Sequence, residues 1–486
     1  MVSNCPQQML KDELFSRLPV AVGKENLASE IQHAVERSSR KVVVLDDDPT
    51  GTQTVHGVDV LTGWNVTVLQ KAFQSDSKLF YILTNSRSLD VIKAREVNAE
   101  IAHNLCTVSR STGVEFDVIS RSDSTLRGHY PDELDVLEEV LTQETGHSFD
   151  AHLLIPAFFE GGRFTVDDIH YVLEGDTLTP ASETEFAKDA VFGYHNSHLA
   201  AYIEEKTGGK CPASAVISVG IADLRLGGPD RVAEILMQAG KGSRIIVNAA
   251  DYSDMEIFVL GLLKAEQSGK RYLVRSSASY VKIRGAITPI PYLTGDQIAP
   301  VDENPNGGLV VVGSYVGKTS AQIKKAREID TLRSLEINVE RLLVDESRPG
   351  EISRVQDEVQ LAIQDGVNIM VYTSRQLIKR PGKEENLNVG QKVSSALVEI
   401  VSSLEVQPSF LIAKGGITSS DLATEALGVK SALVLGQIAP GISVWLLKEE
   451  AKFPGMAYVV FPGNVGTDET LAQVILSLEG RKGLIG

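Results

Sequence analysis

From Lys41 onward, short apolar runs alternate with longer stretches in which apolar residues recur at helical spacing. Short runs of Val, Ile, Leu and Phe predict strands, and amphipathic stretches predict helices. In the first half we expect strands at 42–45, 79–83, 116–120, 153–156, 215–219, 245–248 and 272–275. Helices are expected between them at 90–110, 131–144, 229–239 and 254–268. This alternation predicts an α/β fold with a mostly parallel sheet that is covered on both faces.

A second α/β series follows a proline-rich stretch. Prolines 289, 291, 300 and 305 predict a linker there. In the first half, residues 157–196 interrupt the alternation, and 164–173 predict a hairpin or lid. The expected strands of the second half are 309–313, 368–372, 409–414, 431–435 and 456–461, and its expected helices are 319–328, 389–404, 418–427 and 467–479. We therefore expect an N-terminal helical extension at 1–40, α/β domains at 41–275 and 308–486, a linker at 276–307, and an interdomain cleft.

The composition narrows the functional classes. A chain of 486 residues is too long for one ordinary core, and 43% hydrophobic with 23% charged residues is typical of a soluble globular protein. The net charge of −17 disfavours nucleic acid as a partner, because phosphate backbones bind basic surfaces. We find no apolar run of ~18 residues and no signal peptide pattern, so we expect a cytoplasmic protein. Three widely separated cysteines argue against a disulfide framework or a zinc site.

The most informative segment is 120–130, which follows a predicted strand. Guanidinium groups bind carboxylate or phosphate oxygens in pairs, and hydroxyl and carboxylate side chains bind sugar hydroxyls. The segment therefore fits a small, polyhydroxylated anion, although a polar loop that caps a helix is the alternative. Its candidate side chains are Arg121, Ser122, Asp123, Ser124, Thr125 and Arg127.

Other polar turns also follow predicted strands in the first half. Asp46, Asp47 and Asp48 come after the first strand, at the edge where open α/β sheets bind ligands. One carboxylate could take a proton from a substrate hydroxyl and another could bind a metal ion, and a structural acidic turn is the alternative. Arg87 could reach a substrate carboxylate, although a helix cap with a surface Arg explains the same sequence. Arg163, beside two glycines, is a third candidate for anion contact.

Three glycine-rich turns in the second half each connect a predicted strand to a predicted helix, at 313–319, 414–421 and 462–467. Backbone amides at the start of a helix bind phosphate, so three such turns in one domain favour a nucleotide. Ordinary connections between strands and helices, which also use glycine, are the alternative. The first turn is not a Walker A motif, because Gly313 and Gly317 are four positions apart and that motif needs five.

Five segments, in this order, resemble the four-carbon acid sugar kinase family, which includes threonate, erythronate and 3-oxo-tetronate kinases: 46–51, 121–128, 156–163, 415–418 and 462–466. The resemblance runs from about Lys41 to the C-terminus. It implies an N-terminal sugar-acid-binding domain and a C-terminal nucleotide-binding domain. It implies that the residues facing the sugar acid are Asp47, Arg87, Arg121, Asp123, Ser124 and Arg127. It implies that the residues contacting ATP are Ser314, Gly415, Gly416, Ile417, Thr418 and Gly463.

From this resemblance we expect an ATP-dependent kinase that transfers the γ-phosphoryl group to a hydroxyl of a short sugar acid, with Mg²⁺ arriving with ATP. Asp47 or Asp123 would orient or deprotonate the attacking hydroxyl. Metal ligands are not assigned. The expected partners are the sugar acid and ATP, without nucleic acid or a membrane, and a homo-oligomer is compatible with the sequence.

Three positions depart from the family pattern. Arg121 stands where Lys is usual, Ile417 where an acidic residue is usual, and Phe461-Pro462-Gly463 where Lys-Ser-Gly is usual. The alternative hypothesis is therefore a catalytically silent protein that keeps the fold and binds nucleotide and sugar acid. A sugar-acid dehydrogenase is disfavoured, because no Gly-x-Gly-x-x-Gly follows the first predicted strand.

Overall fold

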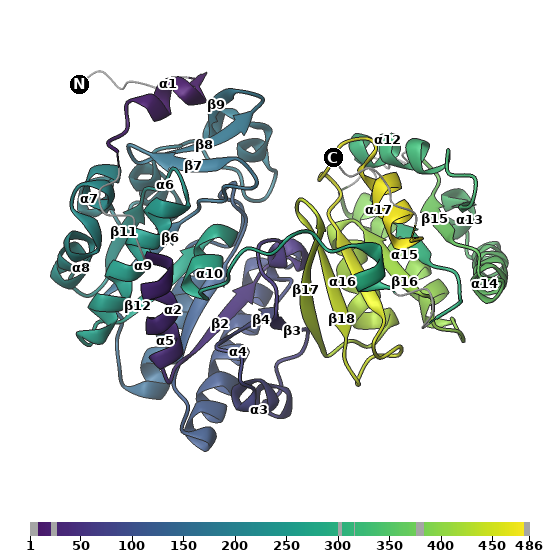
Figure 1. Cartoon of the computed structure of the whole chain (residues 1–486), viewed down its shortest axis with the longest axis horizontal. Coiled ribbons are helices and arrows are strands. Elements are labelled where there is room, and N and C mark those ends of the chain that lie inside the picture. The colour runs from purple at the N-terminus through teal and green to yellow at the C-terminus, as the bar shows by residue number, and fades with distance from the viewer. Residues whose placement is uncertain (1–7, 21–26, 300–303, 315, 376–382, 481–486) are drawn as a thin grey trace. The chain divides into compact units, whose positions relative to one another are not determined.

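The chain folds into two compact α/β units (Figure 1). The structure, a computed structural model, describes residues 8–20, 27–299, 304–314, 316–375 and 383–480. Unit 1 comprises 1–51 and 63–288, and unit 2 comprises 52–62 and 289–486. The predicted fold class of two α/β domains with mostly parallel sheets is confirmed.

Unit 1 is built on a sheet whose strands are the predicted apolar runs. Every neighbouring pair in it is parallel. Most of these strands are buried along their whole length, as expected for a parallel sheet covered on both faces. Their order is β10 (Ile217–Val219), β11 (Ser243–Val247), β6 (Ala151–Ile155), β12 (Tyr272–Ser276), β5 (Phe116–Arg121), β2 (Lys41–Asp46) and β4 (Leu79–Leu83).

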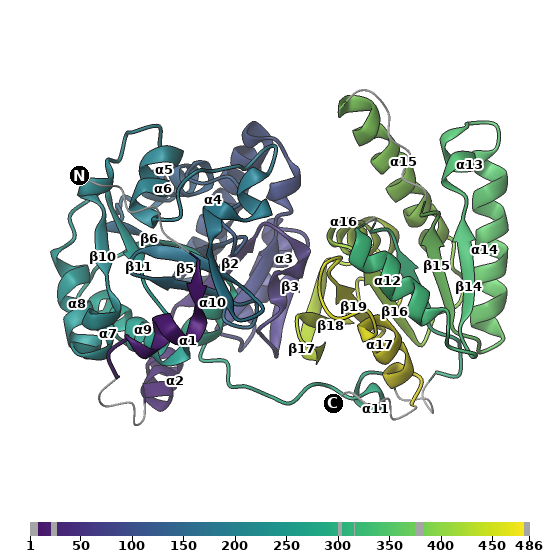
Figure 2. The same ribbon diagram turned by 90° about the horizontal axis from the view of Figure 1, so that it is seen from above.

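Helices connect these strands (Figure 2). Carboxylates cap two of the longest of them. Asp90 accepts a hydrogen bond from the Lys93 amide (2.9 Å), and Asp251 accepts one from the Ser253 amide (2.8 Å). Every helix among the described residues is too short or too polar to cross a membrane. The helices of unit 1 are α1 (Lys11–Ser16), α2 (Leu27–Arg37), α3 (Val66–Gln74), α4 (Val91–Thr112), α5 (Asp132–Thr145), α6 (Leu199–Lys206), α7 (Ile221–Arg225), α8 (Gly228–Gln238), α9 (Tyr252–Gln267) and α10 (Ala278–Arg284).

The segment that interrupts the alternation forms a small antiparallel sheet. The hairpin expected at 164–173 forms as β7 and β8, and β9 and the N-terminal β1 extend it. The order is β1 (Met9–Leu10), β9 (Thr177–Pro180), β8 (Ile169–Glu174) and β7 (Arg163–Val166). Met9 and Leu10, near the described start of the chain, therefore pair with this insertion.

Unit 2 contains a mixed sheet, parallel at one end and antiparallel at the other. Four of the five predicted strands lie in its parallel part, whereas the predicted strand at 431–435 forms β17, which pairs antiparallel with β3 and β18. β3, β14 and β18 were not predicted, partly because β3 is short and β14 carries exposed polar residues. The order is β3 (Val58–Leu61), β17 (Ser431–Ala439), β18 (Ile442–Leu447), β19 (Ala457–Phe461), β16 (Phe410–Lys414), β13 (Leu309–Val312), β15 (Ile369–Thr373) and β14 (Arg333–Ile337).

Segment 52–62 lies between two parts of unit 1 in the sequence but belongs to unit 2. Besides the pairing of β3 with β17, the Thr52 hydroxyl contacts the Ser443 hydroxyl (3.1 Å) and accepts a hydrogen bond from Trp445 Nε1 (3.1 Å). The expected linker 276–307 contains two helices, α10 and α11 (Gly295–Ile298). Residues 300–303 of this segment lie outside the described residues. The helices of unit 2 are α11 (Gly295–Ile298), α12 (Gly317–Ala326), α13 (Val339–Leu343), α14 (Arg348–Gln364), α15 (Lys383–Ser402), α16 (Gly416–Asp421) and α17 (Thr470–Leu478).

Candidate functional site

The polar motifs of the first half meet at the carboxyl edge of the unit 1 sheet. Asp46 pairs in register with Leu83 of β4 and Arg121 of β5, so the segments after these three strands lie side by side. Asp47 and Asp48 follow β2, and Ser86–Ser88 forms a single 3₁₀ turn after β4. In parallel sheets this edge is where ligands bind.

Arg87 joins three carboxylates of the predicted site. Its Nη2 lies 2.5 Å from Asp48 Oδ2 and 3.6 Å from Asp47 Oδ1, and its Nη1 lies 3.7 Å from Asp123 Oδ1. Although burial opposes its charge, Asp47, Asp48 and Asp123 raise the pKa of Arg87 well above its ordinary value. Arg87 is therefore a fixed cation between residues that the sequence assigned to the sugar acid.

Asp47 has one carboxylate oxygen held and one free of hydrogen bonds. The Ser122 hydroxyl donates to Oδ2, whereas Oδ1 is buried and has no hydrogen-bond partner among the described residues. The side chain is 3% exposed, and burial raises the pKa of this carboxyl although Arg87 and Arg275 oppose the shift. A buried acceptor without a partner costs about 1–3 kcal/mol, which a ligand hydroxyl could recover.

A buried ion pair beneath the site was missed by the sequence analysis. Arg275, at the end of β12, donates to the Ser122 hydroxyl (2.6 Å) and the Ser120 hydroxyl (2.8 Å) and pairs with Glu133 of α5. Arg275 thus orients the hydroxyl that holds Asp47. The available signal was a charged residue within an otherwise apolar run, at 272–276.

Asp123 contacts an arginine through each of its carboxylate oxygens, Arg87 at Oδ1 and Arg127 at Oδ2. Arg127 Nε donates to its Oδ2 (2.6 Å), as does the Thr125 hydroxyl. Burial alone would raise its pKa, but Arg87 and Arg127 lower the pKa of Asp123 below its ordinary value. A small pocket opens here, lined in part by Ser122, Asp123, Arg127 and Arg275. Arg127 also lies over the ring of Phe186 (5.0 Å) from the inserted segment.

Arg121 and Ser124 are held by hydrogen bonds within the protein. Arg121 is buried, and its Nη1 donates to Asp46 Oδ1 (3.0 Å). Burial raises the pKa of Asp46 to about 7. The Ser124 carbonyl lies 2.7 Å from His170 Nε2 of β8. The Arg121 guanidinium is therefore engaged by Asp46 in the free protein, and the predicted contacts of these two residues with a sugar acid stay predictions.

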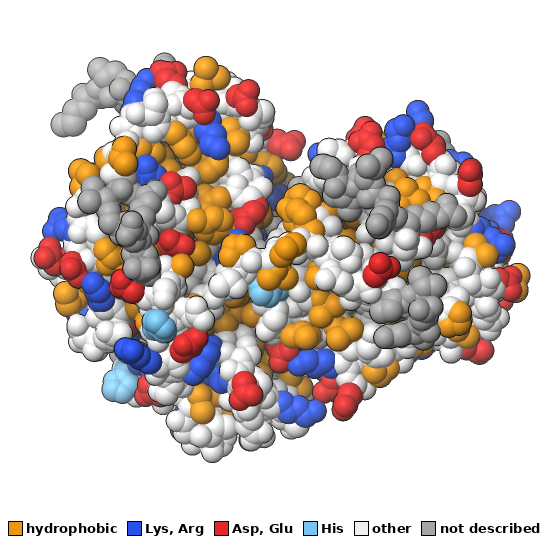
Figure 3. Space-filling view, viewed as in Figure 1, with side chains coloured by type: hydrophobic (Ala, Val, Ile, Leu, Met, Phe, Trp, Pro, Cys, Tyr) orange, Lys and Arg blue, Asp and Glu red, His pale blue; other side chains and the backbone are white. Residues whose placement is uncertain are grey.

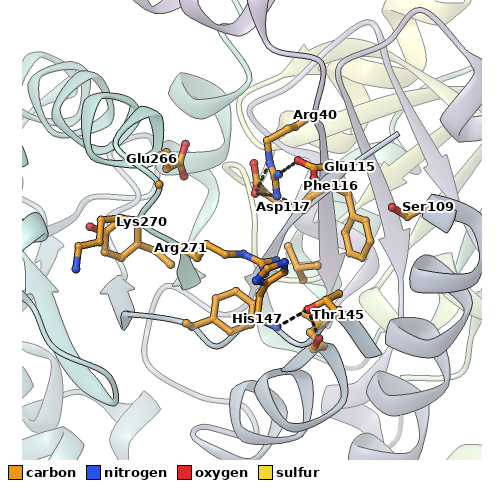
Figure 4. Close-up of a pocket in the computed structure, with 15 residues that line it drawn as sticks. Arg40, Ser109, Glu115, Phe116, Asp117, Thr145, His147, Glu266, Lys270 and Arg271 are labelled. Carbon is orange, nitrogen blue, oxygen red and sulfur yellow. Dashed lines mark hydrogen bonds and ion pairs between the residues drawn. The ribbon is translucent and has the colours of Figure 1, made fainter. Parts of the chain in front are cut away.

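A larger cavity, of about 370 Å³, lies at the opposite edge of the same sheet (Figure 4). Its lining includes Arg40, whose Nη2 lies 2.7 Å from Asp117 Oδ1, and Arg271, which lies over the ring of Phe149 (5.2 Å). None of the residues that the sequence predicted to bind a ligand lines this cavity. We place the site at the carboxyl edge instead, because the predicted polar motifs converge there.

The three glycine-rich turns of the second half also converge, at the carboxyl ends of β13, β16 and β19. A Cβ atom on Gly463 would lie 2.7 Å from Ser314 Oγ, and one on Gly415 would lie 3.3 Å from Ser314 Cβ. A Cβ atom on Gly313 would collide with the Thr418 hydroxyl. The structure thus brings Ser314, Gly415, Thr418 and Gly463 together, as predicted for one ligand.

The surroundings of these turns suit a nucleotide phosphate. The turn at Ser314 leads into α12, whose first amides have no partners within the helix. Arg375 donates to the Ser314 carbonyl (2.6 Å), and Lys318 donates to the Gly466 carbonyl (3.0 Å). Gly416 begins α16, and the adjacent Ile417 is 67% exposed, so its side chain is available to a ligand.

Replacing Gly313 with Ala tests this close packing. The added methyl must displace Thr418 or Leu397, so we expect the free energy of unfolding to fall by about 1–3 kcal/mol and nucleotide affinity to fall with it. Urea unfolding and titration with ATP measure the two effects. Gly350→Ala is the matched control: nothing lies within 4 Å of its added Cβ, so unchanged or slightly higher stability is expected. Equal stability of both variants would contradict the packing.

Metal ligands are not apparent in the part of the chain that the structure describes. It contains no group of three His, Cys, Asp or Glu side chains able to hold a metal ion.

On the face drawn in Figure 3, Lys and Arg are interspersed with Asp and Glu. The charge is therefore mixed over that face.

Two family descriptions match the chain at the positions of the two sites. "Sugar-binding N-terminal domain" matches residues 42–284, and "Nucleotide-binding C-terminal domain" matches residues 309–471. The chain therefore belongs to the family that combines these two domains. No curated protein matches it in sequence.

Solved structures share the fold at low sequence identity. The Haemophilus influenzae protein HI1011, of family DUF1537, has a TM-score of 0.62 at 20% identity and covers 90% of this chain and 99% of its own. A protein of Salmonella typhimurium LT2 described as a putative tRNA synthase has a TM-score of 0.63 at 15% identity and covers 89% of this chain and 98% of its own. Both likenesses concern the fold.

Proposed function

We propose that this protein is an ATP-dependent kinase that phosphorylates a hydroxyl group of a short sugar acid of about four carbons. The sugar-binding and nucleotide-binding domains support the two ligand classes. The observation that carries the proposal is Asp47 Oδ1, a buried acceptor without a hydrogen bond, beside the cation Arg87. Asp47 can accept the proton of a substrate hydroxyl, and the adjacent Arg87 can bind the carboxylate of an acid.

Asp47 is the better candidate for the catalytic base. Its pKa is raised toward the working range, whereas Arg87 and Arg127 lower that of Asp123. In the proposed step Asp47 takes the hydroxyl proton as the substrate oxygen bonds to the γ-phosphorus. The bond to the β-phosphate oxygen breaks, and ADP leaves. Arg87 and Arg127 hold the carboxylate of the sugar acid, with Asp123 fixing Arg127.

The nucleotide is assigned to the glycine-rich turns of unit 2. Ser314, Gly415, Gly416, Thr418 and Gly463 supply backbone amides and hydroxyls to the phosphates, and Ile417 an apolar contact. Mg²⁺ would neutralise phosphate charge and arrive with ATP, since three convergent protein ligands are missing from the described residues. We place the protein in the cytoplasm, where ATP is present.

A screen of C4–C6 sugar acids for ADP release tests this function. Purified protein with Mg-ATP is incubated with each acid, and ADP is followed by a coupled assay. We expect release with one or a few C4 acids and none without acid. Tight binding of ATP and an acid in calorimetry, without ADP release, would instead favour the catalytically silent protein. Ile417 and Pro462, at positions where the family usually carries an acid and a Ser, motivate that alternative.

A further inference from the structure

Lys414 is a buried cation at the proposed nucleotide site that the sequence analysis did not assign. It ends β16 next to Gly415, pairs in register with Phe461 of β19, and is 0% exposed. Its Nζ donates to the Pro462 carbonyl (3.1 Å) and lies 3.8 Å from the centre of the Phe461 ring. No described carboxylate forms an ion pair with it. The ammonium therefore lies under the turn at 462–466 without a counter-charge.

The groups around Lys414 add positive charge. From α12, Lys318 extends to the same turn, and its charge disfavours a second ammonium nearby. On the other packed elements, the Tyr458 hydroxyl of β19 binds a backbone carbonyl, and Asp421 of α16 is hydrogen-bonded by Ser394. Burial, with Lys318, lowers the pKa of Lys414 to about 7. A buried ammonium of this kind is unfavourable until an anion approaches.

We infer that Lys414 is the internal counter-charge for the nucleotide phosphates, and that nucleotide binding is accompanied by proton uptake at this side chain. The inference rests on the proposed nucleotide site. Lys414 acts from beneath the turn as a positioning residue: it holds the Pro462 carbonyl and places a positive charge below Gly463 and Ser314. The arriving phosphates stabilise the ammonium form, so protein that was neutral at Lys414 gains a proton.

The direction of the pH dependence follows from the lowered pKa. Because the pKa of Lys414 is lowered to about 7, a larger fraction of its side chains is neutral at pH 8 than at pH 6 in the free protein. When phosphate raises this pKa again, more proton is taken up per nucleotide at pH 8 than at pH 6. Nucleotide affinity should therefore weaken as pH rises above 7.

Calorimetric titration of the full chain with Mg-ATP, in buffers of different ionisation enthalpy, measures this uptake. We expect net proton uptake at pH 8 that is larger than at pH 6 for the native protein, almost none for Lys414→Met, and affinity on the order of 10- to 100-fold weaker in that variant. Lys324→Met, which removes an exposed cation of α12, is the control and should match the native protein. Urea unfolding without nucleotide should show Lys414→Met at least as stable as the native protein.

Two results would overturn the inference. ATP binding by the native protein without proton uptake at pH 8 would remove the role of Lys414 while leaving the kinase proposal intact. An absence of ATP binding at any pH would remove both. If Lys414→Met fails to fold, the proton uptake of the native protein at pH 8 and pH 6 still decides the question.

Discussion

Replacing Asp47 with Asn is expected to lower kcat by about 10²–10⁴-fold while changing the KM for the sugar acid far less. Asn keeps the shape of the side chain and can still accept the hydrogen bond from Ser122, but it cannot take a proton. At the position of the other oxygen Asn carries an NH2 group, which can donate a hydrogen bond to the substrate hydroxyl, so binding of the hydroxyl should largely survive. Steady-state assays with the acid found in the screen provide the measurement.

Asp123→Asn is the contrasting variant. Because Asp123 holds Arg127, its loss should raise KM more than it lowers kcat. In the native protein, kcat/KM should fall as pH drops through the raised pKa of Asp47, since the base must be ionised, and Asp47→Asn should lose this acid limb. Full turnover by Asp47→Asn at saturating substrate would exclude Asp47 as the base.

Replacing Arg275 with Met is expected to lower the free energy of unfolding by about 3–5 kcal/mol. Arg275 and Glu133 are both nearly inaccessible to water, so removing the guanidinium leaves a buried carboxylate without its partner. Two hydroxyl groups, of Ser120 and Ser122, also lose their donor. Urea unfolding at neutral pH measures the loss.

A double variant separates the ion pair from simple packing. Arg275→Met combined with Glu133→Leu removes both charges, and we expect it to recover a large part of the lost stability. Lys264→Met is the surface control: Lys264 pairs with Asp230 at 2.6 Å, but both are exposed, so the cost should stay below about 1 kcal/mol. If Arg275→Met and Lys264→Met lose similar stability, the buried pair does not support the site as described.

Most strands in the parallel parts of both sheets could be predicted because buried parallel strands are continuous apolar runs, whereas β14, which carries exposed polar residues, was missed. The polar turns could be placed as well, since the carboxyl ends of parallel strands share one edge. Among the antiparallel strands of unit 2, β17 was predicted at 431–435, but β3 and β18 were not: β3 is a short run containing Asp59, and its partner β17 is distant in the sequence. Pairing over such a distance leaves no local pattern.

The candidate site was accessible from the sequence only in part. The motifs containing Asp47, Arg87 and Asp123 were found, and the structure brings these three together. Arg121 could not be told apart from Arg127, because composition does not reveal which guanidinium a buried carboxylate such as Asp46 will engage. Lys414 escaped notice for the same reason, since its lack of an acidic neighbour is a property of the fold.

The strand β3 lies early in the sequence, between two parts of unit 1, but belongs to the sheet of unit 2. Synthesis delivers β3 long before β17 leaves the ribosome, so β3 stays without this partner until nearly the whole chain has been made. Dividing the chain at the linker would leave β17 with a bare edge, which is prone to pair with another molecule. The nucleotide-binding part is therefore not separable from the rest of the chain. Folding of its sheet requires β3, which lies near the other end of the sequence.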